Sequence, residues 1–119
     1  MRAFVAVFRQ LSSDLASELR STGRADIARE LEACTLKRVS FDSEADAGLL
    51  ALEPVQKLNA VERNVMGEKL GQVILFSGPR YASLQLDNFG RVIAIEILAP
   101  PPSLAALLRV TSSLRWSGP

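Results

Sequence analysis

Histidine is absent from this sequence of 119 residues, and cysteine occurs only once. Without histidine the chain lacks the commonest general base near neutral pH and the commonest zinc ligand. The single cysteine, Cys34, cannot form an internal disulfide and is compatible with a reducing compartment. The sequence contains no phosphate-binding glycine loop, no zinc-ligand spacing and no nucleophile elbow. Local motifs therefore indicate no catalytic residue, no cofactor and no metal.

Long hydrophobic runs and an excess of one charge are missing as well. The N-terminal apolar run covers residues 3–8, which is shorter than the roughly 7–15 apolar residues of a signal peptide or the roughly 20 of a membrane-spanning helix. Fourteen Lys and Arg against thirteen Asp and Glu leave a net charge of +1. This balance gives no field that would collect nucleic acid or an anionic membrane. We therefore expect a cytoplasmic protein that binds neither nucleic acid nor membrane.

The rest of the composition is that of an ordinary globular domain. Hydrophobic residues make up 48% and charged residues 23% of the chain, which excludes disorder as a description of the whole. Because one hydrophobic core organises roughly 100–200 residues, we expect a single domain over residues 1–119. It divides into a helical part (1–35), a sheet (36–99) and a short helix with a tail (100–119).

Apolar residues recur every three or four positions in the first part of the chain, which predicts two helices over 12–22 and 25–34. The apolar stripes are Leu11, Leu15 and Leu19 in the first helix and Ile27, Leu31 and Cys34 in the second. Ser12 or Ser13 is expected to cap the first helix, and Gly23 to end it. A single helix kinked at Gly23 is the alternative. Residues 3–8 fit either a strand or a helix, because periodicity cannot separate the two in so short a run.

Strand-like composition follows, interrupted by turn residues. The predicted strands cover residues 36–41, 47–52, 61–65, 73–76, 81–86 and 91–98. Pro54 ends the second strand because proline cannot donate to a ladder. Ser103, after three prolines, is expected to cap a final short helix. This order predicts an α+β fold: an antiparallel sheet of about six strands, with the N-terminal helices packed on one face and a short C-terminal helix.

The last two strands form the clearest predicted hairpin. Their connector runs from Asp87 to Gly90, with Asp where a type I turn favours it and Gly where positive φ is needed. We expect alternation to place three isoleucines in the core against the helices. These are Ile93, Ile95 and Ile97. Glu96 then lies on the other face with Val92 and Ala94, where pairing or solvation is favoured over catalysis.

An acidic stretch is the most suggestive local feature. Its carboxylates are Asp42, Glu44, Asp46 and Glu53, at relative positions 1, 3, 5 and 12 of a calcium loop. Position 6 of such a loop requires glycine, and Ala47 stands there instead. A solvated acidic turn between two strands is therefore favoured over a calcium site. For Cys34, a buried structural role is favoured over a catalytic thiolate, because no histidine is present to activate the thiol.

Two segments resemble a known family. Residues 36–53, LKRVSFDSEADAGLLALE, look like the opening hairpin of a family of small bacterial domains of unknown function, with its D-x-E-A-D turn. Residues 86–98, LDNFGRVIAIEIL, are similar to the closing hairpin, with its G-R-V-x-x-I-E-I-L strand. The order and spacing of the two segments also fit, so the resemblance covers about half of the chain, while residues 67–81 are longer and more apolar than that family's usual middle. The resemblance implies a compact antiparallel-sheet protein without catalytic residues.

The same resemblance implies a non-enzymatic binding protein, since some family members pair with ribonuclease-like toxins as antitoxins. We therefore expect an immunity or antitoxin protein, of the kind found in contact-dependent inhibition, that covers the active or functional surface of a cognate toxin. Its candidate partner-binding residues are Asp42, Glu44, Asp46 and Glu53, which could face a basic cleft. A structural homo-oligomer, formed through residues 73–76 or 103–108, is the alternative. A carboxylate-based enzyme is the least favoured class.

Overall fold

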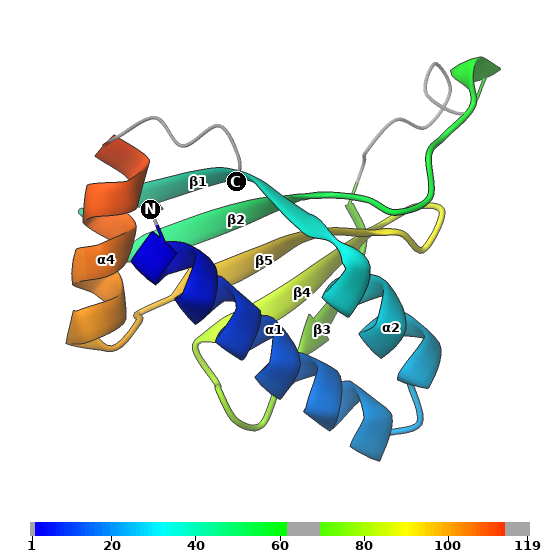
Figure 1. Cartoon of the computed structure of the whole chain (residues 1–119), viewed down its shortest axis with the longest axis horizontal. Helices are drawn as coiled ribbons and strands as arrows, with labels where there is room; N and C mark the ends of the chain where they lie inside the picture. Colours follow the sequence, from blue (N-terminus) through cyan, green and yellow to red (C-terminus); the bar gives the residue numbers. More distant parts are fainter. Residues whose placement is uncertain (1, 62–69, 114–119) are drawn as a thin grey trace.

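The computed structural model describes residues 2–61 and 70–113. In chain order, the helices and strands are α1 (Arg2–Ser21), α2 (Ala25–Ala33), β1 (Thr35–Asp42), β2 (Ala47–Glu53), β3 (Leu70–Leu75), β4 (Ala82–Asp87), β5 (Val92–Leu98) and α4 (Pro102–Ser113). The strands form one antiparallel sheet in the order β1-β2-β5-β4-β3 (Figure 1). The predicted α+β fold, with N-terminal helices and a short C-terminal helix, is confirmed.

The sheet has five strands, whereas about six were predicted. The predicted strand over 61–65 accounts for the difference. Val61 belongs to a stretch with helical backbone conformation, and residues 62–65 lie outside the described residues. The alternation of three apolar and polar residues was too short to establish a strand there.

The first helix begins ten residues before the predicted start, so residues 3–8 are helical. Phe4 and Phe8 extend the predicted leucine stripe by two turns, and both are buried. Ser12 and Ser13 therefore lie within α1, and the prediction that either caps it is wrong. Ser12 is buried and its hydroxyl has no hydrogen-bond partner among the described residues, whereas Ser13 is exposed.

Gly23 separates α1 from α2, as predicted, so the alternative of one kinked helix is wrong. Its φ of +81° is a left-handed conformation that glycine adopts without strain. The chain reverses there, and the Arg24 N–H donates to the Leu19 carbonyl at 2.7 Å. An ion pair between Arg20 and Glu32 then links the two helices side by side.

The core lies between the sheet and the helices. Strand register aligns one row of inward side chains across the sheet: Val39, Leu50, Ile95, Leu84 and Ile74. Ile95 and Ile97 are fully buried, as predicted. The helices supply the opposite side of the core with Leu15, Leu19 and Leu31, also buried. Figure 1 shows α1 and α2 crossing in front of the sheet.

Ile93 was predicted to point into the core and Val92 to point away from it. Both predictions are wrong, because a β-bulge interrupts β5. Gln85 pairs with Ala94 and the next residue, Leu86, pairs with Val92, so Ile93 has no partner on β4. An extra residue shifts the side-chain alternation on one side of the bulge. Val92 is therefore fully buried in the core cluster, and Ile93 is only half-buried.

The C-terminal helix α4 begins at Pro102, one residue before the predicted cap Ser103. Proline suits the first helical position because its missing N–H would have no partner there. The helix packs against β1, and Leu108 lies 3.3 Å from where a Cβ on Gly48 would be. Gly48 pairs with the core residue Ile97, so α4 lies on the same face of the sheet as α1 and α2. No described helix covers the opposite face.

Candidate functional site

One face of the sheet is not covered by any described helix, and we call it the open face. Strand register and alternation assign its side chains: Thr35, Arg38, Ser40, Asp42, Ala47, Leu49, Ala51, Glu53, Val73, Leu75, Ser83, Gln85, Ala94, Glu96 and Leu98. Its central row runs from Ser40 through Leu49, Glu96 and Ser83 to Leu75. Most of these side chains are small or apolar, so the surface is shallow and only sparsely charged.

A hollow of about 370 Å³ lies on this face beside the β1–β2 turn. Its lining consists of Ser40, Phe41, Asp42, Ala47, Gly48, Leu49, Gln85 and Glu96. The two ionisable groups in this lining, Asp42 and Glu96, are both carboxylates, so the hollow is acidic. Glu96 was expected to be away from the core, and the structure places it at the centre of the open face. The hollow therefore suits a cationic side chain that approaches with apolar neighbours.

The acidic turn between β1 and β2 is ordered by its own side chains. Asp42 Oδ1 accepts hydrogen bonds from the backbone N–H groups of Glu44 at 3.0 Å and Ala45 at 3.3 Å. The Asp46 carbonyl accepts from the Ala99 N–H at 2.9 Å, and Asp46 itself has a φ of +50°. Asp42, Glu44 and Asp46 are exposed. These three predicted residues thus lie together at one end of the open face.

One cation from α4 lies close to this turn. The Arg109 guanidinium is stacked over the Phe41 ring, 5.5 Å from its centroid, and its Nε lies 3.4 Å from Ser43 Oγ. This arrangement offsets part of the turn's negative charge. The hollow that contains Asp42 and Glu96 has no Lys or Arg in its lining.

Glu53 lies apart from the other three predicted residues. It ends β2 on the open face, six residues beyond Ala47, which is roughly 20 Å at about 3.4 Å per residue. Its carboxylate forms an ion pair with Lys57. The hydrogen bond from Lys57 lowers the pKa of Glu53, with smaller contributions from the charges of Lys37 and Arg91. The four carboxylates are close in sequence, but the extended strand β2 separates Glu53 from the other three in space.

Cys34 is buried at the end of α2, as expected. Desolvation raises the pKa of its thiol to about 11, and the negative charge of Glu30 contributes. The thiol is therefore protonated at neutral pH and is a poor nucleophile. It lines a pocket of about 410 Å³ between α1 and the start of β1. Within residues 2–61 and 70–113, no three His, Cys, Asp or Glu side chains converge on a point that could hold a metal ion.

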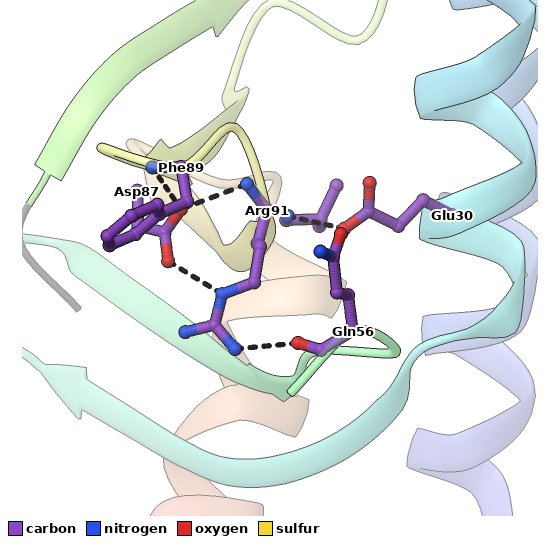
Figure 2. A network of polar contacts seen from close by, with 6 residues as sticks. Glu30, Gln56, Asp87, Phe89 and Arg91 are labelled. Atoms are coloured by element: carbon purple, nitrogen blue, oxygen red, sulfur yellow. Dashed lines mark hydrogen bonds and ion pairs between the residues drawn. The ribbon is translucent and has the colours of Figure 1, made fainter. Parts of the chain in front are cut away.

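A buried ion pair, which the sequence reasoning did not identify, holds the closing hairpin. The Arg91 Nε donates to Asp87 Oδ2 at 2.8 Å (Figure 2). Both side chains are at most 5% exposed. Asp87 Oδ1 accepts from the backbone N–H groups of Phe89 and Arg91, each at 2.9 Å. Gly90 has a φ of +78° in this turn, as predicted. The sequence signal for this pair is Asp-x-x-Gly-Arg. The aspartate carboxylate accepts hydrogen bonds both from the backbone of the turn and from the arginine side chain four positions later.

The same network ties the hairpin to the rest of the fold. Arg91 donates through a second nitrogen to the Gln56 carbonyl at 2.7 Å. Glu30 on α2 accepts from the Val92 N–H at 2.9 Å, beside the bulge (Figure 2). The G-R-V segment that carried the family resemblance therefore has a structural role here. It locks β5 to α2 and to the loop after β2, while Glu96, later in the same motif, remains on the open face.

Comparison of the chain with protein-family models, curated proteins and solved structures finds no match. None of the helices in the described parts of the chain is long and apolar enough to cross a membrane.

Proposed function

We propose that this protein is a non-enzymatic, cytoplasmic binding protein that neutralises a cognate toxin by covering the toxin's active or functional surface. The observation that carries the proposal is the open face, because a sheet with helices on one side only leaves its second side free for a partner. The immunity or antitoxin role comes from the family resemblance of the two hairpins. A protein with such a role supplies a shaped surface and no chemistry of its own.

The side chains of the open face support binding to another protein. Seven of its fifteen members are Ala, Val or Leu, and Leu98 is 52% exposed. Fully buried apolar anchors contribute most of the affinity of protein interfaces, while a polar rim contributes specificity. A small, half-buried residue such as Ala51 allows a helix or strand of a partner to approach the sheet closely.

The carboxylates at the β1–β2 end of the open face indicate a basic partner surface. Asp42 and Glu96 share the acidic hollow, and Glu44 and Asp46 extend the negative surface at the adjoining turn. Such charges mainly steer encounter and select the partner. Nucleases bind an anionic substrate and therefore carry basic clefts, which matches the ribonuclease-like toxins implied by the resemblance.

The test is growth rescue in a bacterial host that expresses the small protein encoded beside this gene. The wild type should restore growth, and Leu49→Arg should fail to do so because it places a long charged side chain at the centre of the open face. Val110→Arg is the matched control, since Val110 is exposed on α4, on the opposite side of the molecule. Both variants should unfold at the wild-type temperature. Rescue by Leu49→Arg would contradict the proposal.

A further inference from the structure

We infer that the free edge of β3 pairs with β3 of a second copy of this chain, so that two five-stranded sheets become one continuous sheet. β3 is last in the strand order and pairs only with β4 among the described residues. Every second backbone N–H and C=O of an edge strand points away from its neighbour and can accept another strand. This dimer would join two open faces side by side, and it does not depend on the proposed toxin.

The two edges of the sheet differ in how they are protected against pairing. At the other edge, β1 carries Lys37, Arg38 and Asp42, and Lys37 is the extra residue of a bulge. The helix α4 also packs against β1. Charged side chains, bulges and covering helices are the usual devices that prevent edge-to-edge association. The β1 edge therefore has three of these devices.

The β3 edge carries no charged residue and no proline from Leu70 to Leu75. Its large apolar side chains are unusually accessible: Leu70 is 54%, Val73 43% and Leu75 78% exposed. The pairing of β3 with β4 is irregular at Gly71, near the beginning of β3. A Cβ at this position would lie 2.5 Å from the Asp87 carbonyl oxygen. Residues 72–75 are left as a regular, uncharged segment in which 73–75 are apolar, which is the type of edge that binds a further strand.

A second copy fits this edge because the segment is complementary to itself. In an antiparallel pair, residues directly opposite each other point to the same face of the sheet. A two-fold axis through Ile74 places Val73 of each copy opposite Leu75 of the other, so four apolar side chains meet on the open face. The two Ile74 side chains meet on the core side. A net charge of +1 opposes this symmetric approach only weakly.

An interface made by one short strand from each copy is small. Interfaces at the low end of the size range form weak and transient complexes. We therefore expect a reversible dimer whose population rises with protein concentration, rather than a dimer that is required for folding.

Sedimentation velocity over a hundredfold range of concentration tests this inference with the purified chain alone. The wild type should shift from monomer to dimer, and Val73→Lys/Leu75→Lys should stay monomeric, because the axis places lysines opposite each other. The matched control Val110→Lys, on α4, should dimerise like the wild type. Equal far-UV circular dichroism and thermal unfolding of all three would show that folding is unchanged. A wild type that is monomeric throughout, or a β3 variant that still dimerises, would overturn the inference.

Oxidative cross-linking tests the register. Ile74→Cys should form a disulfide dimer, since paired residues across an antiparallel edge have Cα atoms about 4.5–5.5 Å apart, within the range of disulfides. Cys34 is buried, so the wild type should remain uncross-linked under the same conditions. Loss of dimerisation in Val110→Lys would instead assign the interface to α4. Dimerisation without any binding of the neighbouring gene product would support this inference while contradicting the proposed function.

Discussion

Asp87→Ala is expected to lower the free energy of unfolding by about 3–5 kcal/mol, because it breaks the buried ion pair between the Asp87 carboxylate and the Arg91 guanidinium. Both side chains are excluded from water, with Arg91 5% and Asp87 0% exposed. The substitution also removes the acceptor for two backbone N–H groups of the turn. Arg91 would keep its bond to the Gln56 carbonyl, which is why the expected loss does not exceed the range for a broken buried pair.

Urea and thermal unfolding measure this loss. For a domain of this size the midpoint temperature should fall by roughly 10–20 °C. Asp87→Asn should be milder, because its amide oxygen can still accept from the two backbone N–H groups. Glu32→Ala is the control: it breaks the exposed Arg20–Glu32 pair, whose side chains are 45% and 40% exposed, and should cost less than about 1 kcal/mol.

Adding Arg91→Met to Asp87→Ala should recover part of the lost stability, because it also removes the buried guanidinium that has lost the Asp87 carboxylate. The coupling energy of the double-mutant cycle isolates the interaction of the two residues. Equal losses for Asp87→Ala and Glu32→Ala, or strict additivity in the cycle, would refute the claim that this pair is buried and coupled.

Three further predictions concern single side chains. Ser12→Ala should raise the free energy of unfolding by about 1 kcal/mol, because it removes a buried hydroxyl that bonds no residue in the described part of the chain. Ser13→Ala at the exposed neighbouring position should change the free energy of unfolding by less than about 0.5 kcal/mol in the same urea titration. Cys34, whose pKa is about 11, should react with a thiol reagent at neutral pH far more slowly in the folded protein than in urea; equal rates would contradict its burial. The Glu18 carboxylate accepts hydrogen bonds from the Ser77 backbone N–H, the Ser77 hydroxyl and the Gly78 N–H, and these bonds lower the pKa of Glu18. The ionised carboxylate therefore stabilises the fold above the ordinary glutamate pKa of 4.5. This stabilisation is lost as the pH falls through the pKa of Glu18 in the folded state. Glu18→Gln should therefore unfold at a lower temperature than the wild type at neutral pH, and the difference should shrink below about pH 4.5; a constant difference would contradict this.

Sequence patterns predicted the elements whose signals are local. The β4–β5 hairpin followed from alternation and from the Asp87 to Gly90 turn, and the break between α1 and α2 followed from Gly23. The start of α1 was predicted wrongly because Ser12 and Ser13 resemble caps. Residues 3–8 are helical because Phe4 and Phe8 pack in the core, and local propensity does not show such tertiary packing.

The candidate site was predictable only in part. The acidic turn was identified by composition, but Glu53 was grouped with it because sequence distance does not show that β2 is extended. The bulge at Ile93 depends on how β4 pairs with β5, so alternation alone assigned Val92 to the wrong face. The hollow shared by Asp42 and Glu96 depends on strand order, which brings β1, β2, β5 and β4 together.

A binding titration with the product of the neighbouring gene tests the central claim most directly. At low salt the wild type should bind, and Asp42→Asn/Glu96→Gln should associate more slowly because the acidic hollow steers a basic partner. The difference should narrow at high salt. Asp14→Asn, an equivalent isosteric change on the exposed surface of α1, should associate like the wild type. Identical association rates for all three proteins at both ionic strengths, or no binding by the wild type, would contradict the claim that the open face binds a basic partner.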